Sequence, residues 1–255
     1  MLQTTVKEVY HLMISDLIAL QFDYATKSFE ENFETLSSLV SKTPKNSLVL
    51  APELCLSGYK YDMLEESSNF SQTALLDIKK LSQNKILSLT LTQKVDNLYF
   101  NNAKIFYNEK EIYSRPKARL FSLGEEEKYF TQGSESDIRI VEIEGIKIAL
   151  LVCFELRFLE LWEKAKGADV ILMPSYWGKS RKTHLESLSK ALAIINQCYV
   201  VVANSSDKDM ASSSCVISPF GDVVCHDNHS TISAKFDKNI IRKMRRYINV
   251  NNSKF

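Results

Sequence analysis

The sequence has little of several features that define other protein classes. Its 255 residues contain only seven Gly and five Pro, which do not cluster, so no stretch has the composition of an interdomain linker. No apolar run approaches the roughly 20 residues that a membrane-spanning helix needs. The N-terminus, MLQTTVKEVYHLMISD, lacks the apolar segment and cleavage site of a secretory signal. These absences predict one domain over residues 1–255, in the cytoplasm and without a membrane partner.

Positive and negative charges nearly balance, and cysteines are few. Lys and Arg number 32 against 31 Asp and Glu, so the net charge of +1 gives no electrostatic reason to expect a nucleic-acid partner. The five cysteines are odd in number and widely spread, which predicts a reduced intracellular protein rather than a disulfide framework. They are Cys55, Cys153, Cys198, Cys215 and Cys225. The expected partner is therefore a small molecule held at a site.

What the sequence does contain is an alternation of short β-rich runs with longer helical ones. Strands are predicted at 16–22, 46–51, 86–91, 101–107, 111–114, 146–154, 169–175, 199–204 and 213–219. Helices are predicted at 28–42, 70–83, 157–166 and 182–197, and polar surface loops at 92–98 and 205–212. In the first helix Phe29, Phe33, Leu36 and Val40 recur at helical spacing. Central strands that are apolar on both faces favour a layered α/β fold.

Three reactive side chains follow predicted strands. Glu53 comes after the strand at 46–51, Lys117 after the strand at 111–114, and Cys153 ends the apolar run LLVC. In α/β sheets such groups collect beyond the carboxyl ends of strands. A thiol has an ordinary pKa of about 8.5 and needs a base before it can attack an amide carbonyl. Glu53 is suited to that role, because a buried carboxylate can take the proton and later return it to the leaving amine.

A carbonyl oxygen under attack gains negative charge, which a cation and a backbone N–H stabilise. Lys117 and the N–H of Phe154 are the predicted donors. The alternative is a purely structural role, as a core cysteine for Cys153 and as surface ion pairs for Glu53 and Lys117. The occurrence of all three residues after predicted strands favours catalysis.

The segments APELCLSGY, SRPKARLF and LLVCFELRF, in that order, resemble the Glu, Lys and Cys segments of the nitrilase superfamily of carbon–nitrogen hydrolases. The resemblance continues through GEEEKYFTQG, MPSYWGKSRKTHLESLSKALAIINQCYVVVAN and SPFGDVV, and covers roughly residues 16–235. It implies a four-layer α-β-β-α sandwich, commonly paired into a homodimer or higher homo-oligomer. It also implies cleavage of a small amide through a cysteine thioester, without cofactor or metal.

The resemblance assigns roles to individual residues. Glu53 is the expected base, Lys117 the oxyanion cation and Cys153 the nucleophile. A second catalytic glutamate is expected at Glu126, three positions before Tyr129, where it would orient the lysine or the substrate. Its neighbours Glu125 and Glu127 are the alternatives if the register slips by one.

Within the superfamily, the sequence is most similar to small amidases of the omega-amidase type, which act on dicarboxylic monoamides. The Arg-Phe pair after the cysteine and the segment containing Trp177, Arg181 and His184 carry that similarity. The expected substrate-binding residues are Tyr59, Phe154, Arg157, Tyr176, Trp177 and Arg181. An ion pair with a nearby glutamate is the alternative for Arg157 and Arg181. The chain departs from the pattern at Arg119, Glu155 and Leu159, which leaves the substrate open.

Other functions remain possible from the sequence. An N-carbamoyl amide hydrolase would use the same triad, and nitriles are a further substrate class. A non-catalytic member would bind a metabolite or a regulatory partner through the same pocket. CHDNH at 225–229 offers potential metal ligands without a distant partner pair, so no metal is expected. RKMRR at 242–246 is interpreted as a solvated tail or subunit contact, and the first sixteen residues as possible subunit contacts.

Overall fold

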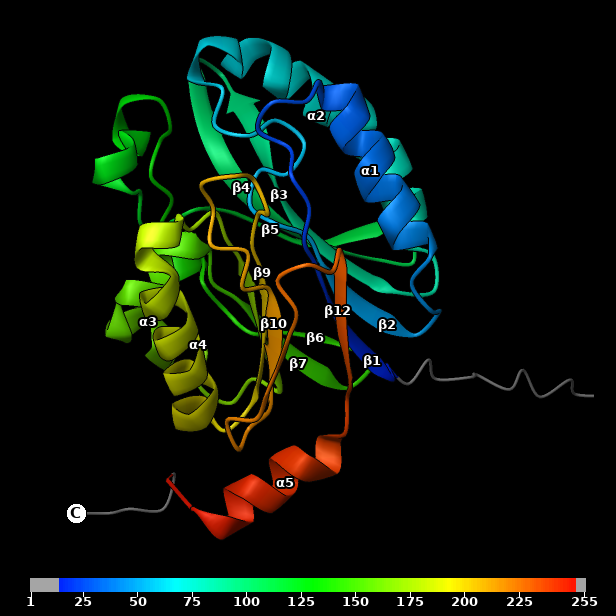
Figure 1. The fold of residues 1–255 in the computed structure, drawn as a ribbon, viewed down its shortest axis with the longest axis vertical. Coiled ribbons are helices and arrows are strands. Elements are labelled where there is room, and N and C mark those ends of the chain that lie inside the picture. The colour runs from blue at the N-terminus through cyan, green and yellow to red at the C-terminus, as the bar shows by residue number, and fades with distance from the viewer. Residues whose placement is uncertain (1–13, 251–255) are drawn as a thin grey trace, which may run out of the picture.

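The computed structural model describes residues 14–250, whose strands form two six-stranded mixed sheets that face each other (Figure 1). The first sheet has the strand order β12-β1-β2-β3-β4-β5, and the second has the order β11-β10-β9-β8-β7-β6. The first comprises Thr231–Lys235, Asp16–Leu20, Ser47–Leu50, Ile86–Val95, Leu98–Tyr107 and Lys110–Pro116. The second comprises Val223–Cys225, Cys215–Ile217, Tyr199–Ala203, Val170–Pro174, Ile146–Leu150 and Val141–Ile143. The first sixteen residues were interpreted as possible subunit contacts, and residues 1–13 of that segment lie outside the described residues.

Helices cover the outer face of each sheet. Helices α1 (Phe29–Ser41) and α2 (Leu64–Leu81) lie on the first sheet, and α3 (Leu159–Lys164) and α4 (Lys182–Asn196) on the second (Figure 1). Helix α5 (Lys238–Tyr247) lies beyond one end of the sandwich. This is the predicted four-layer α-β-β-α arrangement. No helix within residues 14–250 is long and apolar enough to cross a membrane.

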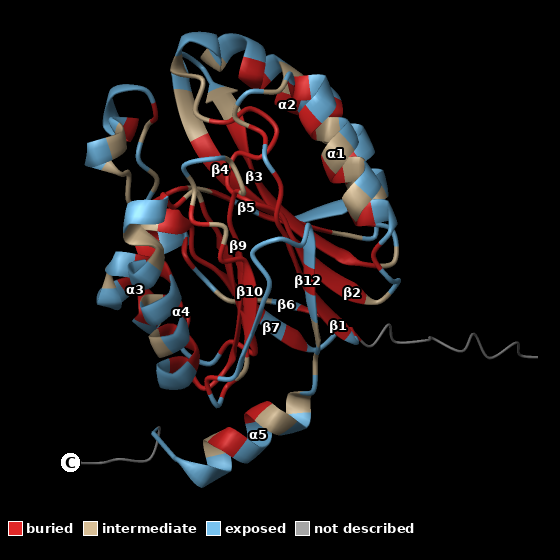
Figure 2. Cartoon of the chain, in the orientation of Figure 1, coloured by how far each residue is buried: buried red, intermediate tan, exposed pale blue. Residues whose placement is uncertain are grey.

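Alternating side chains of the central strands supply both core layers. Leu17 of β1 points into the layer between the sheets, whereas Ile18 points into the layer beneath α1 and α2. Strands β1, β2, β8 and β9 are buried along their whole length, which explains their predominantly apolar sequences. Figure 2 shows this burial for β1, β2 and β9.

The first helix illustrates how local sequence sets an element. Ser28 caps its N-terminus and forms a capping box with Glu31. Phe29, Leu36 and Val40 are buried as predicted, but Phe33 is only half-buried. Asn32 is buried instead, because its Nδ2 donates to the carbonyls of Tyr24 and Leu56 at 3.0 Å each.

Several predicted boundaries were wrong. The strand predicted at 146–154 ends at Leu150, and Cys153 lies in a 3-10 turn, Cys153–Arg157. The helix predicted at 70–83 begins earlier, at Leu64. The loop predicted at 92–98 is mostly strand, because β3 and β4 pair as one long hairpin that leaves only a two-residue turn.

The C-terminal part contains elements that the sequence interpretation missed. Strand β12 pairs antiparallel with β1 and completes the first sheet. The basic run 242–246, interpreted as a solvated tail or subunit contact, belongs to helix α5. That helix is anchored through buried Ile241 and Met244, and Arg245 donates to the carbonyl of Ala168 at 2.6 Å. Ile241 and Met244 recur at helical spacing, but the basic residues around them hid this pattern in the sequence.

Candidate active site

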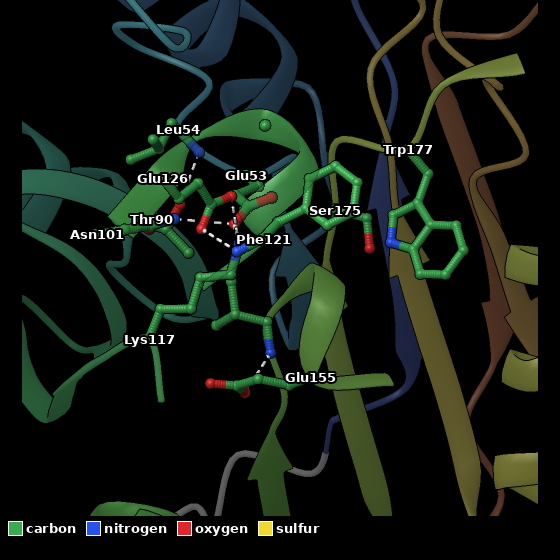
Figure 3. Close-up of polar contacts among 12 residues, drawn as sticks. Glu53, Leu54, Thr90, Asn101, Lys117, Phe121, Glu126, Glu155, Ser175 and Trp177 are labelled. Atoms are coloured by element: carbon green, nitrogen blue, oxygen red, sulfur yellow. Dashed lines mark hydrogen bonds and ion pairs between the residues drawn. The ribbon is translucent and has the colours of Figure 1, made fainter. Parts of the chain in front are cut away.

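Glu53 lies just beyond the end of β2 and is completely buried. Its Oε1 accepts hydrogen bonds from Lys117 Nζ and from Asn101 Nδ2, both at 2.8 Å (Figure 3). Its Oε2 is also buried but has no hydrogen-bond partner among the described residues. One carboxylate oxygen is therefore fixed by two donors, while the other is left to accept a proton.

The backbone around Glu53 is held from both sheets. The N–H of Glu53 donates to the carbonyl of Ser175 at the end of β8 at 3.3 Å, and Tyr24 Oη donates to the carbonyl of Glu53 at 2.6 Å. Leu54 adopts a left-handed backbone with φ of +46°, and its N–H donates to Thr90 Oγ1 at 2.6 Å. A non-glycine residue in this region carries strain that neighbouring contacts must offset. These contacts join the carboxyl ends of β2 and β8 at the site.

Lys117 follows β5 and is fully buried between two carboxylates. Its Nζ lies 2.8 Å from Glu53 Oε1 and 2.8 Å from Glu126 Oε1. Burial alone would lower the pKa of the ammonium, but the negative charges of Glu53 and Glu126 outweigh it and raise that pKa well above its ordinary value. Lys117 is therefore a fixed cation at neutral pH.

Glu126 is the inward-facing member of the triple glutamate. It is 3% exposed, whereas Glu125 and Glu127 are exposed, so the predicted register is correct. Its Oε2 accepts from the N–H of Phe121 at 3.2 Å, while Oε1 holds Lys117 (Figure 3). Burial raises the pKa of Glu126, an effect that the charge of Lys117 partly opposes.

Cys153 opens the 3-10 turn that follows β7 and has a left-handed φ of +47°. The sharp turn matters for Phe154, because N–H groups in the first turn of a helix have no acceptor within that helix. The Cys153 thiol is buried, which raises its pKa well above the ordinary value, and the Glu53 carboxylate raises it further while Lys117 opposes both. The resting thiol is protonated, so attack requires a base.

Glu155 holds this turn rather than lining the cavity. It forms a fully buried, bidentate ion pair with Arg115 of β5, with Nη1–Oε1 and Nη2–Oε2 distances of 2.8 and 2.5 Å. It also accepts from the N–H groups of Val152 at 2.7 Å and Ala118 at 2.6 Å. The residue two positions after Cys153 is thereby bonded to the segment that carries Lys117.

A cavity of about 290 Å³ lies beside these groups. Cys153 and Glu126 line it together with Tyr59, Tyr61, Phe121, Leu123, Gly124, Tyr176, Arg181 and Met210. A narrower extension is lined by Phe121, Cys153, Phe154, Arg157, Tyr176, Trp177 and Arg181. All six predicted substrate-binding residues thus border the space around Cys153. The volume suits a small molecule.

Two arginines bring positive charge to this cavity. The guanidinium of Arg157 stacks over Trp177 at 4.7 Å, and that of Arg181 over Phe121 at 5.0 Å. Within residues 14–250 neither forms an ion pair with a carboxylate, and Arg157 instead contacts His184 Nδ1 at 3.1 Å. The alternative of an ion pair with a nearby glutamate is therefore wrong for both. Each guanidinium remains available to an anionic ligand.

Sequence reasoning missed Asn101 and several lining residues. Asn101 is fully buried in β4 and directly contacts Glu53, and two adjacent asparagines within an apolar strand were the available signal. Tyr61, Phe121 and Met210 come from irregular segments whose path no periodicity predicts. Cys55 packs in the layer beneath α1 and α2. No cluster of three potential metal ligands occurs in the described part of the chain, CHDNH included.

A thiol, a carboxylate with one unpaired oxygen and a buried ammonium beside a small cavity form a site that is chemically suited to hydrolysis by a cysteine nucleophile. The family model for carbon-nitrogen hydrolases matches residues 18–246, and the chain belongs to this family. It is a hydrolase of the carbon–nitrogen bonds of small amides.

Named relatives agree with this assignment. The chain is 31% identical over 217 residues to a 2-oxoglutaramate amidase of Bacillus subtilis, covering 80% of this chain and 83% of that protein. It is 25% identical over 253 residues to a deaminated glutathione amidase of Escherichia coli O157:H7, covering 90% and 94%. A CN-hydrolase superfamily protein from Xanthomonas campestris has the same fold, with a TM-score of 0.84, 18% identity and coverage of 94% and 98%.

Proposed function

We propose that this amidase works through a thioester on Cys153. The observation that carries the proposal is the asymmetry of Glu53, whose Oε1 binds Lys117 and Asn101 while Oε2 is unpaired. Oε2 takes the thiol proton as sulfur attacks the amide carbon. Lys117 and the N–H of Phe154 stabilise the developing oxyanion.

The remaining steps return the enzyme to its starting state. The tetrahedral intermediate collapses, the C–N bond breaks, and Glu53 gives its proton to the departing ammonia or amine. Water then attacks the thioester while Glu53 accepts one of its protons. The second collapse breaks the C–S bond, the sulfur recovers a proton from Glu53, and the carboxylic acid leaves. Glu126 positions Lys117 throughout, since its Oε1 is bonded to Nζ at 2.8 Å.

The substrate class follows from the charges around the cavity. Arg157 and Arg181 carry no carboxylate partner among the described residues, and both border the space at Cys153. An unpaired guanidinium binds a carboxylate bidentately. Tyr59 adds a buried hydroxyl without a partner in the described residues, at the same cavity. We therefore favour a short amide that also bears a carboxylate, which is a dicarboxylic monoamide. The 2-oxoglutaramate in the name of the Bacillus subtilis relative is a compound of this class.

A matched pair of substrates tests this assignment. Turnover of short dicarboxylic monoamides should exceed that of the corresponding uncharged amides, N-carbamoyl compounds and nitriles. Arg181→Met should raise KM for the monoamide about 10-fold or more, because a charged hydrogen-bonded contact is lost. The same change should leave the uncharged amide nearly unaffected. Lys179→Met, two positions earlier and exposed, is the control. Preference for an N-carbamoyl substrate would contradict the substrate class, and absence of any turnover would favour the binding-protein alternative.

The assembly proposed is a homodimer or higher homo-oligomer of single-domain subunits in the cytoplasm. Its support is a group of exposed apolar side chains around the ends of α4 and α5, where Ile195 is 57% and Tyr247 76% exposed. A cavity of about 380 Å³ lies there and is bordered by Ile194, Met244 and Ile248. Light scattering during size-exclusion chromatography should give at least twice the mass of one chain, and Ile195→Asp should lower it.

A further inference from the structure

Cys215 and Cys225 lie directly opposite each other in the second sheet. Strands β10 and β11 are antiparallel, and their register pairs these two residues. Side chains of directly opposed residues in such a pair point to the same face. Both are free thiols, and neither takes part in the proposed hydrolysis.

The hydrogen-bond pattern brings the two cysteines close together. At the hairpin, Ser218 N–H donates to the carbonyl of Asp222 at 2.8 Å, which makes this a hydrogen-bonded pair. Hydrogen-bonded and non-hydrogen-bonded pairs alternate along an antiparallel ladder. Cys215 and Cys225 are three positions further along and thus form a non-hydrogen-bonded pair, in which the Cα atoms lie about 4.5 Å apart. A disulfide spans Cα separations of about 4.4–6.8 Å.

The two thiols differ in access. Cys225 is exposed at the edge of the sheet, whereas Cys215 is 4% exposed. Both border a cavity of about 300 Å³ between the hairpin and α4, which Glu186 and Lys190 also line. A small molecule can therefore approach Cys225 with Cys215 immediately behind it.

The hairpin that carries the pair is held in place against α4. Gly221 occupies the left-handed position of the turn, with φ of +86°, and a Cβ there would lie 2.9 Å from Ile194 Cδ1. Such close packing fixes the turn and hence the register of β10 against β11. The ammonium of Lys182 interacts electrostatically with Cys225.

We infer that Cys215 and Cys225 form a redox modification site, which a low-molecular-weight disulfide converts reversibly into a cross-strand disulfide. Cys225, as thiolate, attacks one sulfur of the small disulfide, so that one thiol leaves and a mixed disulfide forms. Cys215 then loses its proton and attacks the sulfur of Cys225, which expels the second thiol. The protein dithiol is oxidised by two electrons, and the small disulfide is reduced to two thiols.

The test treats the folded full-length protein with oxidised glutathione and maps its cysteines by mass spectrometry. The expected product is a peptide pair cross-linked between Cys215 and Cys225, lighter than the reduced pair by two hydrogen atoms and restored by dithiothreitol. In Cys215→Ser, Cys225 should instead retain one glutathione. In Cys225→Ser, the shielded Cys215 should remain a free thiol.

Two controls separate this site from general thiol reactivity. Cys198→Ser should leave the cross-link unchanged, because Cys198 is buried elsewhere. The double variant Cys225→Ser with Val224→Cys moves the thiol to the opposite face of β11, and its cross-linking with Cys215 should fall at least about tenfold. A wild-type protein that keeps both thiols, or carries a glutathione on Cys225 with Cys215 still reduced, overturns the inference. So does equal cross-linking in the shifted variant.

Discussion

Arg115 and Glu155 join the two segments that carry Lys117 and Cys153. Their bidentate ion pair is fully buried, with distances of 2.8 and 2.5 Å, and Arg115 Nη2 also donates to the carbonyl of Leu150 at 2.7 Å. The pair belongs to different sheets, since Arg115 ends β5 and Glu155 follows β7. It therefore fixes the lysine segment relative to the nucleophile.

Loss of the Glu155 charge should destabilise the whole fold. Glu155→Gln leaves a buried guanidinium without its counter-ion, and breaking a buried pair in this way costs about 3–5 kcal/mol. Glu160→Gln removes a glutamate from the exposed pair with Arg119 and should change the free energy of unfolding by less than about 0.5 kcal/mol. Urea unfolding of both variants checks this. Similar midpoints for the two would show that the buried pair is not a structural anchor.

Glu53→Gln should remove turnover without unfolding the protein. The amide keeps the shape of the side chain but cannot accept the thiol proton, so kcat should fall by about 10²–10⁴-fold. The exposed Glu66→Gln is the matched control and should retain normal kcat. Steady-state kinetics and the near-UV circular dichroism of both variants provide the measurement. A kcat within a few-fold of wild type in Glu53→Gln would exclude it as the base.

Asn101 should act on turnover by positioning Glu53. Asn101→Ala removes the 2.8 Å hydrogen bond to Oε1, and a bond to a charged group contributes about 1.5–3 kcal/mol, equivalent to about 10- to 100-fold in kcat. KM should change little, because Asn101 does not line the cavity.

The adjacent residue provides the control for Asn101. Asn102 points to the opposite face of β4, where its Nδ2 donates to Ser114 Oγ at 3.1 Å. Asn102→Ala should lose stability but keep kcat. If the two variants lose kcat equally, the effect of Asn101 is general destabilisation rather than positioning of the carboxylate.

The pH dependence of kcat/KM should extend far into the alkaline range. The pKa of Lys117 is raised by Glu53 and Glu126, so the lysine is fully protonated below the ordinary pKa of about 10.4 and loses its charge only as pH rises through its higher folded value. The lysine charge contributes to folding stability and to oxyanion binding, and both contributions are lost as pH rises through that folded pKa. We expect kcat/KM to hold between about pH 8 and 10. An alkaline decline within that range that is absent in Lys117→Arg would show that the lysine titrates earlier.

The positions of Glu53 and Cys153 could be predicted from the sequence because each follows an apolar run that belongs to a buried strand. Both side chains lie beyond the carboxyl ends of their strands, where the Glu53 carboxylate interacts electrostatically with the Cys153 thiol. Glu126 was predicted from the family resemblance, and the structure buries its side chain.

Other features depend on contacts that no local pattern contains. Glu155 was identified from the sequence only as a departure from the family pattern, because its partner Arg115 lies 40 residues away. Helix α5 was missed because its two buried side chains, Ile241 and Met244, are surrounded by basic residues that suggest a solvated tail. Asn101 was missed because its partner Glu53 is distant in sequence.

Trapping of the acyl-enzyme tests the central claim most directly. The protein should be incubated with a short dicarboxylic monoamide, quenched in acid and analysed by peptide mass spectrometry, with a parallel reaction in hydroxylamine. The account predicts an acyl group on Cys153 and release of the corresponding hydroxamate, with both abolished in Cys153→Ala and unaffected in Cys198→Ser. Turnover that persists in Cys153→Ala, or an acyl group on another residue, would contradict it.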